Sequence, residues 1–185
     1  MKRWLVLDRD GVINHDSDDY IKNADEWLAI PGSLEAIARL NQAGYHVLVA
    51  SNQAGIGRGL FQQQDLEAMH QKMHRLLATA GGRIRGVYYC SHHPDESCQC
   101  RKPKTGMLDS MERDHKISLK GCSFVGDSEK DLQAAITKGC TPILVRTGKG
   151  ERTLQRIAGK TQYRNLAIFD NLSDFADFLL KETSC

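Results

Sequence analysis

Two carboxylates, Asp8 and Asp10, follow the apolar run 4–7 directly, and Gly11 after them lets the chain turn. In open α/β sheets, ligands bind just beyond the carboxyl ends of the strands. Two acidic groups in such a crevice repel each other unless a cation or a shared proton relieves them. A hard cation such as Mg²⁺ suits these oxygen ligands and commonly binds together with phosphate. The pair could instead form an acidic surface turn, because Asp and Gly are common turn residues.

Three further predicted strands lead to side chains suited to phosphate chemistry. Ser51 and Asn52 follow the second strand, Lys102 follows a loop after the third, and Asp127 ends the fourth. Since the carboxyl ends of parallel strands meet at one edge of a sheet, these groups would lie close to Asp8. Together they supply a nucleophile, a metal site, hydrogen-bond donors and a cation. Phosphoryl transfer needs these groups, because its transition state spreads negative charge over the transferring oxygens.

We assign Asp8 as the nucleophile, because it ends the strand directly and its attack on phosphorus would form an aspartyl phosphate. Asp10 would protonate the leaving oxygen and then activate water, which requires a less acidic environment for its carboxyl group. Asp8, Asp10 and Asp127 are the Mg²⁺ candidates, with a backbone carbonyl near Asp10 as a further ligand. Ser51 would bind phosphoryl oxygens and Lys102 would neutralise their charge, although Ser51 could simply terminate a strand and Lys102 could be a solvated surface lysine.

Asp131 lies four residues after Asp127, so both can face the site, and we expect Asp131 to support it from behind. It could instead complement the dipole of the helix that it begins. Only 40 residues lie between Asp10 and Ser51, which leaves no room for a large cap domain, so loops must recognise the substrate. The candidate substrate-binding residues are Arg9, Asp16, Asp19, Tyr20, Asn52, Gln53 and Arg101.

Cys90, His92, Cys98 and Cys100 form a second cluster, within eleven residues of the chain. Three thiolates and one imidazole can close a tetrahedral Zn²⁺ site with no open position, which indicates a structural metal. We expect Zn²⁺ to staple this loop and thereby to aim the phosphate-binding lysine that follows it. His93 is the alternative histidine ligand.

Composition indicates one soluble domain spanning residues 1–185, with 41% hydrophobic and 26% charged residues. The net charge of +2, with both signs interspersed, argues against nucleic-acid and membrane partners. Nothing in the sequence points to an obligate partner, so we expect a monomer that acts on a small phosphorylated molecule. The sequence has neither a recognisable signal peptide nor an apolar stretch of roughly 18 residues, which predicts a cytoplasmic protein. In that compartment Cys122, Cys140 and Cys185 are expected to be buried or terminal thiols.

Strand and helix signals alternate along the chain. We expect strands at 4–7, 46–50, 87–89, 123–125, 142–145 and 167–169, and helices around 34–40, 66–76, 129–138 and 175–179. The glycines of segment 55–59 indicate a loop, and the basic segment 147–164 has no clear signal. This alternation predicts an α/β fold with a Rossmann-like parallel sheet, helices on both faces, no large cap domain and a zinc-stapled loop.

Four segments resemble the ordered motifs of the haloacid dehalogenase phosphatases. These are Asp-Arg-Asp-Gly-Val at 8–12, Ser-Asn-Gln at 51–53, Arg-Lys-Pro at 101–103 and Gly-Asp-Ser-Glu-Lys-Asp at 126–131. The resemblance covers most of the chain, from the first strand to at least Val145. It implies a Rossmann-like fold, Mg²⁺ dependence and an aspartyl-phosphate intermediate.

Zinc-loop phosphatases of this family include two kinds that this chain resembles. Some remove the 7-phosphate of D-glycero-D-manno-heptose 1,7-bisphosphate on the route to ADP-heptose or GDP-heptose and bacterial lipopolysaccharide, and others act on histidinol phosphate in histidine biosynthesis. Segments 8–14, 55–59 and 106–108 look closer to the heptose type. The seven residues between Cys90 and Cys98 resemble the histidinol type.

The residues themselves leave the substrate open. Arg101 could clamp the non-reacting phosphate of a bisphosphate. The acidic residues Asp16, Asp18 and Asp19 could instead pair with the amine of histidinol phosphate, or form a solvated loop. A receiver-like domain that accepts phosphate on an aspartate for signalling is a further alternative, which Asp10 opposes because a receiver lacks such an acid/base.

Overall fold

The computed structural model describes residues 3–182 of the chain, so Cys185 lies outside the described residues. Its centre is a sheet in which all strands are parallel, in the order β3-β2-β1-β4-β5-β6. The strands are β1 (Arg3–Leu7), β2 (Tyr45–Asn52), β3 (Gly86–Cys90), β4 (Ser123–Gly126), β5 (Thr141–Val145) and β6 (Ala167–Phe169). This order is that of a Rossmann-like sheet, which confirms the predicted fold class.

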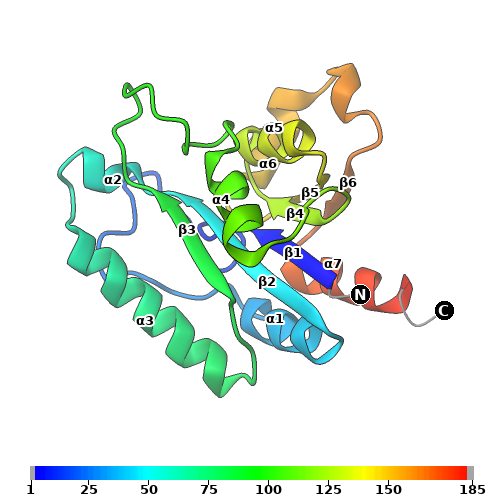
Figure 1. Ribbon diagram of the computed structural model, residues 1–185, viewed down its shortest axis with the longest axis horizontal. Coiled ribbons are helices and arrows are strands. Elements are labelled where there is room, and N and C mark those ends of the chain that lie inside the picture. The colour runs from blue at the N-terminus through cyan, green and yellow to red at the C-terminus, as the bar shows by residue number, and fades with distance from the viewer. Residues whose placement is uncertain (1–2, 183–185) are drawn as a thin grey trace.

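Helices cover both faces of the sheet (Figure 1). One face carries α1 (Ser33–Gln42), α3 (Gln63–Thr79) and α7 (Leu172–Glu182), and the other carries α4 (Gly106–His115), α5 (Glu129–Lys138) and α6 (Gly150–Ile157). Side chains of β1 alternate between the two faces, so Leu5 and Leu7 pack on the first side and Val6 on the second. A central strand buried on both faces reads as a continuous apolar run, which explains the clear sequence signal for β1.

Two helices and two single helical turns were not predicted. Helix α4 buries Met107, Leu108 and Met111, whose spacing is helical, whereas α6 buries few apolar side chains and therefore has a weak apolar pattern. The loop expected at 55–59 is wrong for its first part, because Ala54–Gly57 forms the single helical turn α2. A side chain at Gly55 would collide with the ring of Phe61, so this glycine allows close packing. A 3₁₀ turn, η1 (Thr161–Tyr163), also lies in the segment left unassigned.

The connection from β1 to α1 moves away from the end of β1 after Asn14 and comes back beside Asn14 at Ala29. Asn14 forms an isolated bridge with Ala29. On either side of this bridge, the His15 amide donates to the Leu28 carbonyl at 2.9 Å and the Ile30 amide donates to the Ile13 carbonyl at 2.9 Å. Residues 15–28 therefore form an excursion whose two ends are paired, and this excursion contains no helix.

Two properties bear on the remaining sequence expectations. None of the helices within residues 3–182 is long and apolar enough to cross a membrane. Cys122 and Cys140 are free thiols, half-buried and buried respectively.

Candidate active site

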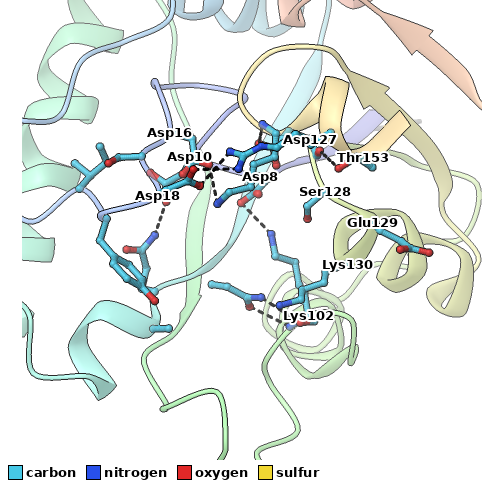
Figure 2. Close-up of a pocket in the computed structure, with 18 of the residues that line it drawn as sticks. Asp8, Asp10, Asp16, Asp18, Lys102, Asp127, Ser128, Glu129, Lys130 and Thr153 are labelled. Carbon is cyan, nitrogen blue, oxygen red and sulfur yellow. Dashed lines mark hydrogen bonds and ion pairs between the residues drawn. The ribbon is translucent and has the colours of Figure 1, made fainter. Parts of the chain in front are cut away.

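A cavity of about 400 Å³ opens at the carboxyl ends of β1, β2 and β4 (Figure 2). Strand β1 has β2 on one side and β4 on the other, so the direction in which successive strands are added to the sheet reverses here. Such a switch point is where ligands bind in doubly wound sheets. Asp8, Asp10 and Asp127 reach the cavity from the ends of β1 and β4.

Asp8, Asp127 and Asp131 form a buried carboxylate cluster, with one oxygen of each within 4.8 Å of the others. Burial and the nearby charge of Asp131 raise the pKa of Asp8 to about 7, although Lys102 acts in the opposite direction. Burial, followed by the charges of Asp8 and Asp131, raises the pKa of Asp127 well above its ordinary value. Crowded carboxylates that resist ionisation fit a hard divalent cation, which would relieve their repulsion.

Two glycines let the chain close around Asp127. Gly11 and Gly148 both have positive φ, at 85° and 59°, and a Cβ at either position would collide with the Asp127 carboxylate. The Lys149 amide donates to Asp127 Oδ2 at 2.7 Å, and the Thr153 hydroxyl donates to its main-chain carbonyl at 2.7 Å. The start of α6 therefore holds Asp127 in place.

Lys102 lies beneath the cluster as a buried cation, with 3% of its side chain exposed. Its Nζ lies 2.9 Å from Asp8 Oδ1 and 2.6 Å from Asp131 Oδ1, and it donates to the Ala50 carbonyl at 2.7 Å. Burial alone would lower the pKa of Lys102, but the carboxylates of Asp131 and Asp8 outweigh it and raise this pKa. Asn52 anchors the main chain of Lys102 through two hydrogen bonds of 3.0 and 3.1 Å.

Asp131 has a second role at the start of α5. The amide and hydroxyl groups of Ser128 donate to Asp131 Oδ2 at 3.0 and 2.6 Å, which caps the helix. With its other oxygen beside Lys102, Asp131 supports the cluster from behind, where the sequence spacing had placed it.

The Asp10 carboxylate stands apart from this cluster. It accepts hydrogen bonds of 2.9–3.1 Å from Arg9, one of 2.8 Å from Asn14 and one of 2.7 Å from Gln53. Burial would raise its pKa, but the Arg9 charge and these hydrogen bonds outweigh burial and lower it. The prediction that the Asp10 carboxyl lies in a less acidic environment is therefore wrong for this state of the protein. The Asp10 side chain is committed to these donors, which leaves its main-chain carbonyl as the candidate metal ligand.

The structure brings some predicted substrate-binding residues to the cavity and not others. Asp16, Tyr20, Asn52, Gln53 and Arg101 line it. Arg9 does not, because it is completely buried behind Asp10, and Asp19 points to solvent. Ser51 is also buried outside the lining, where its hydroxyl accepts a 2.7 Å hydrogen bond from Gln53.

The opposite wall of the cavity is basic, and sequence reasoning missed most of it. Lys130 from α5 lies there with Lys149, Arg152 and Arg156 from the start and body of α6. Burial, then repulsion by Arg101 and Lys149, lowers the pKa of Lys130. Arg101 Nη1 is buried with no hydrogen-bond partner in the described chain. The signal was available, because residues 149, 152 and 156 recur at helical spacing in the unassigned basic segment.

Two ion pairs join the β1–α1 connection to α6 at this wall. Asp18 makes a bidentate pair with Arg152 at 3.0 Å for each bond, and Asp16 lies 2.8 Å from Lys149 Nζ. They tie the excursion 15–28 to a helix more than 120 residues further along the chain.

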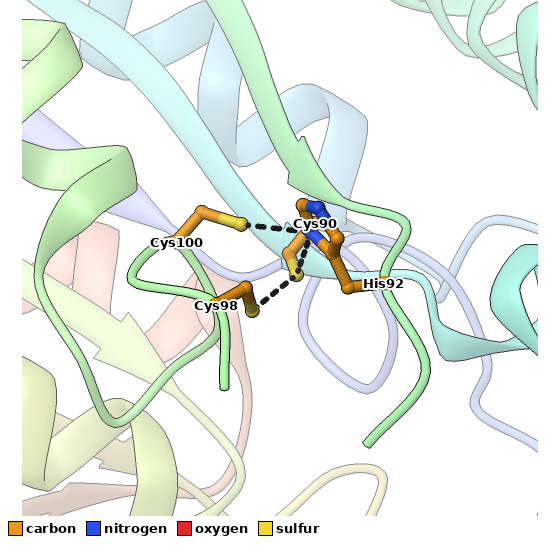
Figure 3. A group of neighbouring side chains, drawn as sticks. All are labelled: Cys90, His92, Cys98 and Cys100. Carbon is orange, nitrogen blue, oxygen red and sulfur yellow. Dashed lines mark hydrogen bonds between the residues drawn. The ribbon is translucent and has the colours of Figure 1, made fainter. Parts of the chain in front are cut away.

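The second cluster contains Cys90, His92, Cys98 and Cys100, with donor atoms within 4.8 Å of one another (Figure 3). The Sγ atoms of Cys90 and Cys98 are 3.6 Å apart, and His92 Nδ1 lies 3.5 and 3.3 Å from the sulfurs of Cys90 and Cys100. Tetrahedral Zn²⁺ with its usual bond lengths separates such ligands by about 3.5–3.8 Å, so the four residues fit this metal. His93 instead contacts Asp95, which favours His92 as the ligand.

Comparison with known proteins gives one consistent result. A model of the polynucleotide kinase 3 phosphatase family matches residues 5–141. A D-glycero-beta-D-manno-heptose-1,7-bisphosphate 7-phosphatase of Pseudomonas putida is 52% identical over 178 residues, covering 96% of this chain and 99% of the relative. A protein of the same name from Pseudomonas aeruginosa is 53% identical over 177 residues, covering 96% and 97%. A crystal structure of D,D-heptose 1,7-bisphosphate phosphatase from B. bronchiseptica, complexed with magnesium and phosphate, matches with a TM-score of 0.92 at 47% identity, covering 97% of this chain and 99% of that chain.

Proposed function

Because this chain belongs to the polynucleotide kinase 3 phosphatase family, which is haloacid dehalogenase-like, we propose that it removes the 7-phosphate of D-glycero-β-D-manno-heptose 1,7-bisphosphate. The observation that carries the proposal is a cavity with two unlike walls, one holding the carboxylate cluster and the other basic. A bisphosphate presents one phosphate to each wall. The relatives' names favour the β-heptose substrate over histidinol phosphate. We also propose that the product is a precursor of ADP-heptose or GDP-heptose.

Asp8 is the proposed nucleophile. Its carboxylate oxygen would attack phosphorus, the bond from phosphorus to the sugar oxygen would break, and the aspartyl phosphate would form. Lys102 would neutralise charge beside Asp8, from which it is 2.9 Å away. Mg²⁺ held by Asp8, Asp127 and the Asp10 carbonyl would supply charge stabilisation at the phosphoryl oxygens.

Asp10 is the proposed acid and base. Its lowered pKa makes it a carboxylate in the free protein, which suits proton removal from water in the second step. A phosphate dianion bound nearby adds negative charge and raises this pKa, so that Asp10 can carry the proton that the leaving sugar oxygen takes. Water then attacks the aspartyl phosphate, the bond to Asp8 breaks, and phosphate leaves.

The basic wall is proposed to hold the 1-phosphate. Arg101 lines the cavity, and its guanidinium could bind two phosphate oxygens at once. Lys130 and Arg156 would add charge that a single-phosphate substrate such as histidinol phosphate would leave uncompensated.

We extend the proposal to the remaining properties of the protein. Zn²⁺ at the cysteine cluster would be structural, because four protein ligands leave no open position. The protein would act as a cytoplasmic monomer with one domain spanning residues 1–185, and without a nucleic-acid or membrane partner.

The test is phosphate release with Mg²⁺ from the β and α anomers of the heptose bisphosphate, from histidinol phosphate and from an oligonucleotide with a 3′-phosphate. We expect the highest kcat/KM with the β anomer and release of one phosphate per molecule. A higher kcat/KM with histidinol phosphate or the oligonucleotide would contradict the proposed substrate. No release from any of them would contradict the phosphatase chemistry.

A further inference from the structure

Arg9 connects the acid/base candidate to a histidine on α3. The guanidinium of Arg9 is completely buried. Its Nε and Nη2 atoms hold Asp10, while its Nη1 atom lies 3.3 Å from His70 Nε2. Within residues 3–182, His70 is the only hydrogen-bond partner of this Nη1.

Hydrogen-bond chemistry fixes the state of the histidine. A guanidinium carries only donors, so His70 Nε2 must accept and its proton must lie on Nδ1. Burial, then the charge of Arg9, lowers the pKa of His70 to about 3, so the ring keeps this acceptor at neutral pH. The ring also contacts Tyr89 of β3, with centroids 5.8 Å apart, which restrains its orientation.

We propose that His70 is a positioning residue, which orients the Arg9 guanidinium and through it the Asp10 carboxylate for proton transfer. The role rests on the proposed function, since it presumes that Asp10 is the acid and base of a phosphatase. Asn14 and Gln53 each give Asp10 one hydrogen bond, but Arg9 alone gives it three. A guanidinium that loses its acceptor leaves a buried donor unsatisfied, so it would shift toward another acceptor and change the geometry of its hydrogen bonds to Asp10.

The test compares three single variants. H70L removes the acceptor, H70Q replaces it with an amide oxygen, and H74L makes the same change as H70L one helical turn away at an exposed position. Thermal unfolding measured for all three separates folding defects from catalytic ones. If H70L does not fold, the comparison of H70Q with a second acceptor-free variant, H70F, gives the same contrast.

Two kinetic readouts follow proton transfer rather than fold. With the heptose bisphosphate, we expect the acceptor-free variant to lose roughly tenfold to a hundredfold in kcat, with KM nearly unchanged, since a positioned acid/base contributes about a hundredfold or more. p-Nitrophenyl phosphate has a leaving group that needs no proton, so Asp8 would still be phosphorylated rapidly while water activation slows. A burst of about one p-nitrophenolate per enzyme should therefore appear in H70L and not in H74L.

The outcomes separate the two proposals. Restored kcat in H70Q together with a burst in H70L supports the positioning role. Equal kcat in H70L and H74L, or a loss in H70L without a burst, overturns it. Absence of Mg²⁺-dependent turnover in the unaltered protein with either substrate would instead overturn the proposed function.

Discussion

Replacement of Lys102 by Met gives the sharpest test of the carboxylate cluster. Lys102 is buried between Asp8 and Asp131, at 2.9 and 2.6 Å. At an effective dielectric constant of 20, each contact corresponds to a gross attraction of about 6 kcal/mol, most of which desolvation offsets. Without Lys102, the two carboxylates stay within 4.8 Å of each other with no cation between them.

We expect K102M to lower the free energy of unfolding by about 3–5 kcal/mol, the usual cost of removing one partner of a buried ion pair. For a protein of this size, that loss corresponds to a decrease in Tm of about 6–20 °C. The assay is urea unfolding in buffer without Mg²⁺, followed by circular dichroism. The exposed Lys120, changed to Met, is the matched control and should shift stability by less than about 0.5 kcal/mol.

A double-mutant cycle isolates the ion pair from the loss of packing. D131N removes one of the two carboxylates, so K102M/D131N should be less destabilised than the sum of the single variants, by about 2 kcal/mol. A loss below about 1 kcal/mol in K102M, or additive effects in the cycle, would refute the reasoning that Lys102 compensates the cluster.

Three further predictions concern the metal loop, the acid/base and a surface ion triad. Replacing Cys98 by Ser should sharply reduce zinc content, measured by atomic absorption, together with turnover, and normal turnover in zinc-free protein would contradict the role of the loop. Asp10→Asn should lower kcat by about 10²–10⁴-fold in the folded protein, with a decrease in Tm because the buried Arg9 charge loses its partner, and near-normal kcat would exclude Asp10 as acid/base. Lys138 lies 2.6 Å from both Asp109 and Glu112, and its hydrogen bonds and charge outweigh burial and lower the pKa of each carboxyl. The stabilisation of the folded protein by these ion pairs is present above the ordinary carboxyl pKa values and is lost as pH falls through the lowered ones. K138M should therefore lower the free energy of unfolding by about 1 kcal/mol or less at pH 7. A loss that stays constant down to pH 3 in urea titrations would contradict this prediction.

The sheet and the reactive aspartates were predictable because strong local signals mark them. Buried parallel strands are continuous apolar runs, and Asp8 and Asp127 follow two of them directly. The partners of Asp10 were not predictable in this way. Arg9 is adjacent in sequence, and its type suggested a group that faces the substrate. Its complete burial depends on packing against α3, far along the chain.

The basic wall was missed for a different physical reason. Helix α6 is only eight residues long and buries only Gly150, Thr153 and Ile157, so few apolar residues mark it in the sequence. Its position is set instead by polar contacts, chiefly the two hydrogen bonds to Asp127. Such contacts between distant segments leave no periodic pattern, although the spacing of the basic residues on the helix could have indicated a charged face.

The paired ends of the excursion 15–28 separate substrate choice from chemistry. Because Asn14 and Ala29 bridge at its base, the chain re-enters the fold beside the point at which it leaves. Residues could be added or removed between these ends without changing the path of β1 or the place of Asp8 and Asp10. The architecture thus allows the part of the cavity that we propose meets the sugar to diverge among related proteins, while the positions of the reacting groups stay the same.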